Sequence, residues 1–298
     1  MIVGSDSLIG GALMSELKRT GRQVIGTTRR RETVDTDHFY LDLLKDPGTW
    51  NCPDFVTVAF VCASVTRIES CRRDPVESAR VNVKGIFELV RNLTEKGIFV
   101  IYLSTNQVFD GTVPHRLPDD QLSPITEYGK QKAEAERLIS RFDPLVAIVR
   151  FSKILEPRNP LFCEWQRLLR KGKVIHPFFD MVMAPVGLAC AVSILSIMGE
   201  HCLPGIFQVS GNEDVSYAEV AHIGATICGV DERLVQPVLS SRSGCYLEKV
   251  VEHTTMDVTR LKLVFGVEIP DVRTTIKTIF TELLAFEERS VSLKKGEY

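Results

Sequence analysis

The sequence lacks an excess of charge of either sign. Among its 298 residues, 36 Lys and Arg stand against 38 Asp and Glu, for a formal net charge of −2. Such a balance produces no overall field that would attract nucleic acid or an anionic membrane. A long apolar run is also lacking, because Pro185 and Gly187 divide the uncharged stretch 181–199. The helix left over has about 13 residues, or about 20 Å, against the ~30 Å of a bilayer core. We expect neither nucleic acid nor a membrane as a partner.

Cysteine pairs of the C-x-x-C type are absent. The eight cysteines are scattered along the chain, at Cys52, Cys62, Cys71, Cys163, Cys190, Cys202, Cys228 and Cys245. No histidine stands close enough to complete a zinc spacing, so we expect no metal site. The N-terminal residues have neither a basic region nor a long apolar core, so no signal peptide is expected. Scattered thiols of this kind are typical of a reduced, cytoplasmic protein.

Short β-rich runs alternate with helical periodicity in the first half of the chain. The predicted strands are 1–3, 23–28, 38–43, 55–61, 98–103 and 145–151. The predicted helices are 8–20, 75–96 and 125–141. Asp74 and Pro75 supply the N-cap and first residue of the second helix. This alternation predicts the α/β class, with a Rossmann-type doubly wound parallel sheet whose ligands bind beyond the carboxyl ends of its strands.

The pattern loosens after residue 151. Helices are predicted at 160–170, 186–198, 216–228, 257–264 and 272–287, with short strands at 173–175 and 206–209. This predicts a smaller C-terminal α/β lobe that binds substrate. We divide the chain into a Rossmann domain, 1–151, and a mainly substrate-binding lobe, 152–298, with a return into the Rossmann domain around 181–210 as a further option.

The turn after the first predicted strand is the first motif that carries chemistry. Gly4, Ser7 and Gly10 form a G-x-x-S-x-x-G pattern between a strand and a helix. A helix N-terminus holds a dinucleotide pyrophosphate through its free N–H groups and its dipole, and glycine lets the backbone approach closely. We therefore place cofactor contacts at Gly4, Ser7, Leu8, Ile9 and Gly10. The alternative is a plain strand-to-helix turn.

The end of the second predicted strand indicates which cofactor to expect. An acidic residue there binds the ribose 2′-hydroxyl of NAD(H), whereas arginine accommodates the 2′-phosphate of NADP(H). Thr28, Arg29 and Arg30 stand at this point, and no Asp or Glu occurs within 25–31. We expect NADP(H) to be preferred and NAD(H) to be the second option; the alternative is a solvated basic turn. Further cofactor contacts are expected at Asp42, Leu43, Cys62, Ala63 and Ser64.

The strongest constellation joins a strand end to a helix start. Tyr128 and Lys132 lie four residues apart, so both project from one face of the predicted helix. An ammonium beside a phenol stabilises the phenolate and lowers the pKa of the tyrosine from about 10, which makes it a general acid/base. Thr105 adds a hydroxyl that can hold a substrate oxygen. On its own, Y-x-x-x-K is more often a surface Tyr and Lys.

These segments resemble the extended short-chain dehydrogenases/reductases, and within them the dTDP-4-dehydrorhamnose reductase-like (RmlD-like) branch. That branch carries a segment close to S-T-D-Y-V-F-D-G followed by Y-G-x-x-K, which stands here as 104–111 and 128–132. Supporting matches at Asn82, at Arg150 and in 205–211 extend the resemblance over nearly the whole chain.

The resemblance implies an NAD(P)-binding Rossmann domain, a C-terminal lobe that binds a nucleotide-sugar, and the catalytic set Thr105, Tyr128 and Lys132. In such enzymes hydride passes to a keto carbon while tyrosine protonates the oxygen and lysine also grips the nicotinamide ribose. Asn82 is then a structural and proton-relay position. Tyr128, Lys132 and Arg150 thereby join the expected cofactor contacts. The expected substrate contacts are Ser104, Asn106 and Gln107.

The chain departs from the branch at three positions. Ser7 replaces a glycine where the pyrophosphate approaches, and Asn106 and Gln107 stand where the branch has Asp and Tyr. We interpret the chain as an NAD(P)H-dependent reductase of a 4-keto nucleotide-sugar. One alternative is a cofactor-binding regulatory subunit that resembles that of methionine adenosyltransferase. Another is a nucleotide-sugar epimerase or dehydratase, although dehydratases use an acidic pair where this chain has two amides. A homodimer is a further option for the assembly of the chain.

Overall fold

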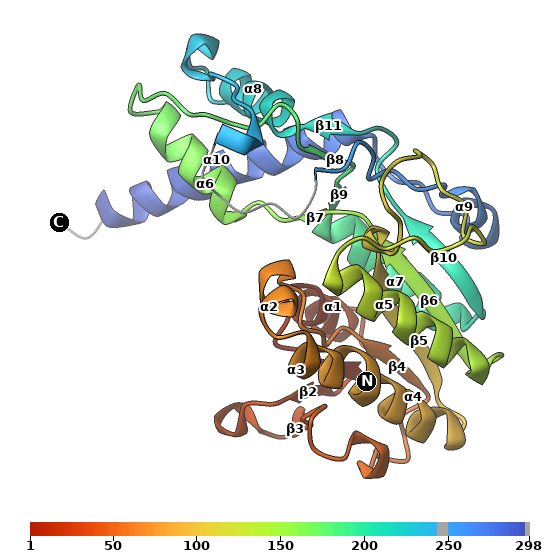
Figure 1. The fold of residues 1–298 in the computed structure, drawn as a ribbon. Coiled ribbons are helices and arrows are strands. Elements are labelled where there is room, and N and C mark those ends of the chain that lie inside the picture. The colour runs from red at the N-terminus through yellow and green to blue at the C-terminus, as the bar shows by residue number, and fades with distance from the viewer. Residues whose placement is uncertain (243–249, 296–298) are drawn as a thin grey trace.

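A seven-stranded sheet with the order β10-β6-β5-β4-β1-β2-β3 forms the centre of the fold (Figure 1). This is a computed structural model that describes residues 1–242 and 250–295, so Cys245 lies outside the described residues. The strands are β1 (Ile2–Val3), β2 (Gly26–Thr28), β3 (His38–Tyr40), β4 (Val58–Val61), β5 (Phe99–Thr105), β6 (Val146–Phe151) and β10 (Gly205–Val209). All neighbouring pairs in this sheet are parallel. The predicted Rossmann-type α/β class is therefore confirmed.

Helices cover both faces of this sheet, as a doubly wound fold requires. The helices on one face are α1 (Leu8–Arg19) and α7 (Leu188–His201). Those on the other face are α4 (Ile86–Glu95) and α5 (Glu127–Ile139). On α4, Leu89 and Leu93 lie four residues apart and are fully buried against the sheet. The spacing of apolar residues that predicted these helices is thus the spacing that fixes them to the strands.

A π-helical turn interrupts the predicted helix 75–96. The helix begins as expected, because the Asp74 carboxylate accepts a hydrogen bond from the Glu77 N–H at 2.9 Å at the start of α3 (Pro75–Ala79). The turn Arg80–Gly85 follows and leads into α4. It contains Asn82, which is fully buried. Such turns are rare and frequently lie at functional sites.

A second, smaller hydrophobic core builds the C-terminal lobe. Its helices are α6 (Pro160–Leu169), α8 (Tyr217–Ile227) and α10 (Val272–Lys295). The rings of Phe162 and Phe280 stack in this core with 5.1 Å between their centroids. The chain returns to the sheet with α7 and β10, and α9 (Thr259–Phe265) packs against β10. The two bodies that result are visible in Figure 1.

Several short elements were not predicted. They are α2 (Ile68–Arg73), β7 (Ile154–Leu155), β8 (Val182–Met183), β9 (Val186–Gly187) and β11 (Val215–Ser216). Two-residue strands contain too few residues to show an alternating pattern. They form here because β7 pairs with β9 and β8 pairs with β11. The predicted strand 173–175 is wrong, since only an isolated bridge between Ile175 and Val235 forms there.

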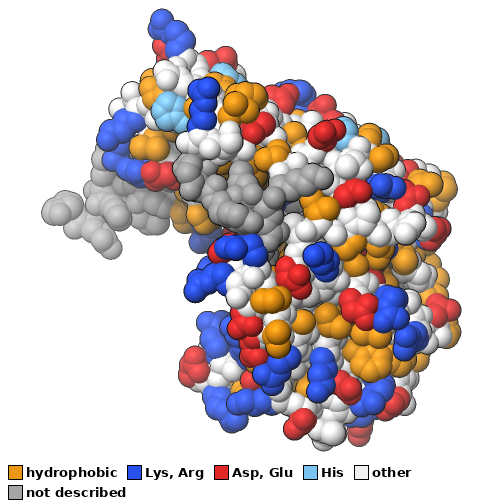
Figure 2. Space-filling view, in the orientation of Figure 1, with side chains coloured by type: hydrophobic (Ala, Val, Ile, Leu, Met, Phe, Trp, Pro, Cys, Tyr) orange, Lys and Arg blue, Asp and Glu red, His pale blue; other side chains and the backbone are white. Residues whose placement is uncertain are grey.

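The surface agrees with the balanced composition. Lys, Arg, Asp and Glu side chains are interspersed over the face shown in Figure 2. Within the described part of the chain, no helix combines the length and the apolar character needed to cross a membrane. The uncharged stretch 181–199 contributes most of α7, which packs against α1.

Candidate active site

A cleft of about 580 Å³ opens where the carboxyl ends of the central strands meet the C-terminal lobe. One wall comes from the β1–α1 turn, the end of β5 and the start of α5; the other includes residues 181–183 and Tyr217. The predicted site residues that line it are Ser7, Leu8, Ile9, Cys62, Ser64, Ser104, Thr105, Asn106, Gln107, Tyr128 and Lys132. The structure therefore brings together residues that are more than 100 positions apart in the sequence.

The β1–α1 turn has the shape that a dinucleotide pyrophosphate needs. Gly4 has a φ of +81°, and a Cβ atom there would lie 2.8 Å from the Cβ of Ala63. A Cβ atom at Gly10 would lie 2.4 Å from the Gly4 carbonyl oxygen. Both positions thus require glycine, and the backbone at the start of α1 stays open to close approach. These residues fit an NAD(P) cofactor, with Gly4, Gly10 and Ala63 shaping the turn.

Ser7 is the N-cap of α1. Its hydroxyl accepts a hydrogen bond from the Gly10 N–H at 3.1 Å and donates one to the Gly4 carbonyl at 2.8 Å. The N–H groups of Leu8 and Ile9 have no intrahelical carbonyl acceptor, as in the first turn of any helix, and the helix dipole favours an anion beside them. Serine in place of glycine therefore stabilises this turn and leaves these two donors for a phosphate.

The end of β2 carries the expected basic residues and one acid that was not expected. Thr28 is buried, whereas Arg29 and Arg30 are exposed. The Arg30 guanidinium lies 3.1 Å from the carboxylate of Asp6, which belongs to the β1–α1 turn. Asp6 was not predicted as a site residue, because it follows the first strand in the sequence and reaches the end of β2 from a neighbouring loop.

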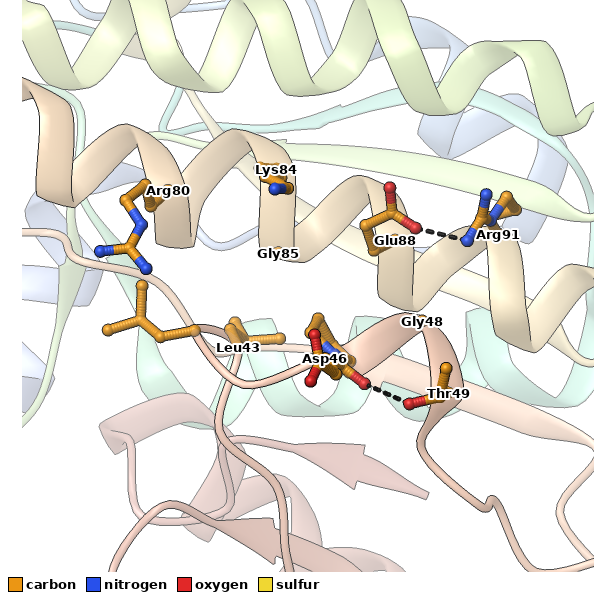
Figure 3. Close-up of a pocket in the computed structure, with 11 residues that line it drawn as sticks. Leu43, Asp46, Gly48, Thr49, Arg80, Lys84, Gly85, Glu88 and Arg91 are labelled. Carbon is orange, nitrogen blue, oxygen red and sulfur yellow. Dashed lines mark hydrogen bonds and ion pairs between the residues drawn. The ribbon is translucent and has the colours of Figure 1, made fainter.

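Asp42 and Leu43, both predicted as cofactor contacts, do not line the cleft. Leu43 borders a separate cavity of about 280 Å³ between residues 43–49 and the helix that carries Arg80 and Arg91 (Figure 3). Its carbonyl oxygen lies so close to Gly85 that a Cβ there would be 2.4 Å away. The Asp42 carboxylate accepts a hydrogen bond from the Leu44 N–H at 3.0 Å. Both residues shape the loop after β3.

Tyr128, Lys132 and Thr105 converge in the cleft. The Thr126 hydroxyl caps α5 by accepting a hydrogen bond from the Gly129 N–H at 3.0 Å, which places Tyr128 in the first turn. Lys132 Nζ donates to Tyr102 Oη at 3.1 Å and to the Leu103 carbonyl at 2.6 Å. Tyr102 is fully buried and was not predicted as a site residue. The lysine is thus anchored to β5 beside the tyrosine of its own helix.

Burial dominates the protonation of this set. It raises the pKa of Tyr128 well above the usual value of a phenol and lowers the pKa of Lys132 to about 7. The expected lowering of the Tyr128 pKa was therefore wrong, because burial is the main effect on this phenol and raises its pKa. A tyrosine with a raised pKa is protonated at neutral pH, and this is the form that donates a proton to a ketone oxygen.

The lowered pKa of Lys132 predicts how stability varies with pH. Between about pH 7 in the folded state and 10.5 in the unfolded state, unfolded Lys132 binds more protons than folded Lys132, so its contribution to the free energy of unfolding rises with pH. Urea unfolding of wild type and Lys132→Met should show a difference that shifts in favour of wild type from pH 7 to pH 10. Lys130→Met, at an exposed position of the same helix, is the control. A difference that stays constant with pH would contradict the assignment.

Asn82 connects the π-helical turn to α5. Its side-chain oxygen accepts hydrogen bonds from the Ser64 hydroxyl and the Val65 N–H, both at 2.8 Å. Its amide group donates to the Val65 carbonyl at 3.0 Å and to Gln131 Oε1 at 2.9 Å. These hydrogen bonds hold the loop after β4 against the helix of Tyr128. These contacts give Asn82 a structural role next to the predicted site.

Arg150 does not reach the cleft, contrary to the expected cofactor contact. Its side chain is 2% exposed and forms an ion pair with Glu136 at 2.7 Å. Its remaining hydrogen bonds go to the Pro118 carbonyl and to Gln208. Ser104, although it lines the cleft, donates its hydroxyl hydrogen to the same Glu136 carboxylate. Arg150 therefore anchors β6 to α5 and to the loop that contains Pro118.

The side chains of Asn106 and Gln107, which follow β5, lie between Thr105 and the start of α5. The Thr105 hydroxyl accepts a hydrogen bond from the Gln107 N–H at 3.2 Å, and Gln107 Oε1 accepts one from the Thr126 hydroxyl at 3.0 Å. Asn106 Oδ1 lies 3.4 Å from the Thr105 hydroxyl.

Burial raises the pKa of the Cys62 thiol, which also lines the cleft, to about 12, so this cysteine remains protonated and unreactive.

Lys153 and His253 also line the cleft, from the second half of the chain. Lys153 follows β6, and His253 Nδ1 lies 3.2 Å from an Asp214 carboxylate oxygen. No Asp or Glu is among the described residues that line the cleft, and Lys153 has no carboxylate within ion-pair distance in that part of the chain. The described residues also contain no group of three or more His, Cys, Asp and Glu placed to hold a metal. The lining therefore favours an anionic ligand.

Comparison with known proteins agrees with this geometry. The family model described as RmlD substrate binding domain matches residues 1–285. The chain belongs to the RmlD family. A curated dTDP-4-dehydrorhamnose reductase from Aggregatibacter actinomycetemcomitans is 25% identical, over 94% of this chain and 97% of that protein. The resemblance predicted from the sequence is therefore confirmed.

Two further proteins are similar to most of this chain. The structure of a dTDP-4-dehydrorhamnose reductase from Bacillus anthracis in complex with NADP is similar with a TM-score of 0.80 at 19% identity, over 94% of this chain and 96% of that one. Methionine adenosyltransferase 2 subunit beta of Xenopus tropicalis is 24% identical, over 82% of this chain and 76% of that protein. The predicted class, a dTDP-4-dehydrorhamnose reductase-like NAD(P)-dependent oxidoreductase of the extended short-chain type, is confirmed.

Proposed function

We propose that this RmlD-family protein reduces the 4-keto group of a nucleotide-sugar with NADPH, and with NADH as a second cofactor. The observation that carries the proposal is the convergence of Thr105, Tyr128 and Lys132 in one cleft, next to a glycine turn that fits a dinucleotide. The relatives of known activity that match almost the full chain support the same reaction. Arg29 and Arg30 at the end of β2 support the preference for NADPH.

Thr105, Tyr128 and Lys132 each have a separate role in the proposed reaction. When bound, the reduced nicotinamide supplies a hydride to the keto carbon. Thr105 holds the ketone oxygen through its hydroxyl, and the Tyr128 phenol gives that oxygen a proton, so the ketone becomes an alcohol and the tyrosine a phenolate. The Lys132 ammonium stabilises the phenolate. With a pKa of about 7, Lys132 then returns a proton to Tyr128 and regains one from solvent near neutral pH.

The wall formed by the C-terminal lobe supports an anionic substrate. Lys153 is a cation of the cleft with no carboxylate within ion-pair distance among the described residues, and a phosphate of a nucleotide-sugar would supply an anionic partner. We expect Lys153→Met to raise the KM for the nucleotide-sugar about tenfold, as the loss of one charge-assisted hydrogen bond implies, with little change in the Kd of NADPH. Lys173→Met, at an exposed position outside the cleft, is the control. An unchanged KM would remove Lys153 from the substrate site.

The proposal is tested by NADPH oxidation at 340 nm with purified protein over a panel of 4-keto nucleotide-sugars. Oxidation that depends on one of these sugars supports the reductase. Binding of NADPH without oxidation across the panel would instead favour a regulatory role, as in the methionine adenosyltransferase subunits that match this chain at 24% identity. The amides Asn106 and Gln107 give no support to a dehydratase, which needs an acid and a base beside the threonine.

The proposal also includes a homodimer and a cytoplasmic location. A groove of about 630 Å³ between α3 and α5 supports the dimer, because its apolar residues include Val76, which is 72% exposed, and charges of both signs flank it. Cys52, Cys62, Cys190 and Cys202 are free thiols, which is typical of a reducing compartment. Light scattering measures the mass of the purified protein in solution, and a dimer predicts twice the mass of one chain.

A further inference from the structure

The carboxylate of Asp6 is bound to the end of the neighbouring strand β2. Its Oδ2 atom accepts a hydrogen bond from the Thr28 hydroxyl at 2.6 Å and one from Arg30 Nε at 3.2 Å. Its Oδ1 atom lies 3.1 Å from Arg30 Nη2. The Thr28 hydroxyl in turn accepts a hydrogen bond from the Arg30 N–H at 3.0 Å. Asp6, Thr28 and Arg30 thus form one hydrogen-bonded cluster that joins the glycine turn to the strand end.

This cluster occupies the place where a dinucleotide fold holds the adenosine ribose. In such folds an acid at the end of β2 binds the ribose 2′-hydroxyl, and an arginine accommodates a 2′-phosphate. Here the strand has no acid within 25–31. Asp6 brings a carboxylate to the same place from the loop after β1, and the two strands run parallel as neighbours in the sheet. The position therefore carries an acid and an arginine at once.

We propose that Asp6 sets the choice between NADH and NADPH by presenting its carboxylate to the 2′-hydroxyl of NADH and opposing the 2′-phosphate of NADPH. The inference rests on the proposed function only in requiring that the chain binds a nicotinamide dinucleotide. It explains how a chain with Arg29 and Arg30 at the end of β2 retains NADH as a cofactor, since Arg30 is partly neutralised by Asp6 before any ligand binds.

The charges at this position support the assignment. Partial burial raises the pKa of Asp6, but hydrogen bonds from Arg30 and Thr28 outweigh this effect and hold the pKa below its usual value, so the carboxylate is ionised at neutral pH. A phosphate monoester carries about −1.5 to −2 charges at pH 7. The Asp6 side chain is 30% exposed, which leaves it accessible to a ligand at the strand end. A charged Asp6 carboxylate beside the 2′-phosphate disfavours NADPH. The 2′-hydroxyl of NADH, in contrast, donates a hydrogen bond to the same carboxylate.

The test is calorimetric titration of wild type and Asp6→Asn with NADPH and with NADH. We expect the variant to bind NADPH about tenfold more tightly, because the repulsion between the carboxylate and the 2′-phosphate is removed. We expect it to bind NADH several-fold more weakly, because the 2′-hydroxyl loses a charge-assisted hydrogen bond. Asp54→Asn removes an exposed charge of the same domain that contacts neither Thr28 nor Arg30, so its two Kd values should match those of wild type. A ratio of the two Kd values that changes less than twofold in Asp6→Asn would overturn the proposal.

The outcomes separate the inference from the proposed function. Failure of wild type to bind either dinucleotide would overturn both, whereas binding without sugar reduction leaves the cofactor preference measurable. Asp6→Ser, which keeps a hydroxyl acceptor for Thr28, repeats the test if thermal melting shows that Asp6→Asn does not fold. Arg30→Met is expected to weaken NADPH about tenfold and to affect NADH less. Equal losses for the two dinucleotides in Arg30→Met would contradict the placement of the 2′-phosphate at this cluster.

Discussion

Replacement of Tyr128 by phenylalanine is expected to lower kcat for keto-sugar reduction by a factor of about 10²–10⁴, the usual contribution of a positioned general acid. The phenol is the proton donor of the proposed reaction, and its raised pKa keeps it protonated at neutral pH. The ring remains in Tyr128→Phe, so the packing at the start of α5 and the Kd of NADPH should change little. Steady-state kinetics together with calorimetric titration of NADPH separate the two quantities.

A matched variant distinguishes proton donation from the loss of any hydroxyl in the cleft. Tyr217 lies in the wall that the C-terminal lobe provides. Tyr217→Phe is expected to change the KM of the sugar more than kcat. If Tyr128→Phe retained more than about half of the wild-type kcat, when a loss of 10²–10⁴ is expected, the assigned acid would be wrong.

Replacement of Arg150 by methionine is expected to lower the free energy of unfolding by about 3–5 kcal/mol, the cost of leaving one member of a buried ion pair alone. Arg150 and Glu136 are 2% and 3% exposed, so loss of the guanidinium leaves the Glu136 carboxylate buried without its partner charge. Urea unfolding measures the loss. The Kd of NADPH for the folded fraction should stay near that of wild type, because the side chain does not line the cleft.

Helix α5, which carries Glu136, offers a control for the Arg150 result. Arg137 and Glu134 form an ion pair at 2.5 Å with side chains that are 57% and 42% exposed. Arg137→Met should cost about 0–1 kcal/mol. Joint replacement of Arg150 and Glu136 by methionine should restore much of the loss, since no buried charge is then left unpaired. Unchanged stability with weaker NADPH binding in Arg150→Met would return this residue to the cofactor site.

The sequence allowed the fold to be predicted, and also the residues of the candidate site that lie together in the cleft, because both depend on local pattern. Alternating periodicities located the strands and helices of the sheet, and the spacing of Tyr128 and Lys132 placed both on one helix. Gly4 and Gly10 were identified as positions of close approach, and the structure gives the neighbours that forbid a side chain there. Such features need only the chain within one strand–turn–helix unit.

The residues that were missed or misplaced depend on contacts between distant segments. Tyr102 lies within a strand that is buried along its whole length, like any core residue, yet its hydroxyl accepts a hydrogen bond from Lys132 across 30 positions of sequence. Asp6 meets Thr28 across 22 positions. Arg150 was assigned to the cofactor on the family resemblance, and no local pattern shows that Glu136 pairs with it. Pairing across the fold, rather than residue type, decided these three roles.

The central claim is that this cleft transfers hydride to a nucleotide-sugar carbonyl. The most direct measurement uses NADPH deuterated at the transferable position of C4, together with a 4-keto nucleotide-sugar that the panel identifies, and locates the label in the product by NMR. The account predicts deuterium on C4 of the sugar in wild type, and a strongly reduced rate of labelling in Tyr128→Phe. Bound NADPH that remains fully reduced with every 4-keto nucleotide-sugar, or a label found elsewhere in the product, would contradict it.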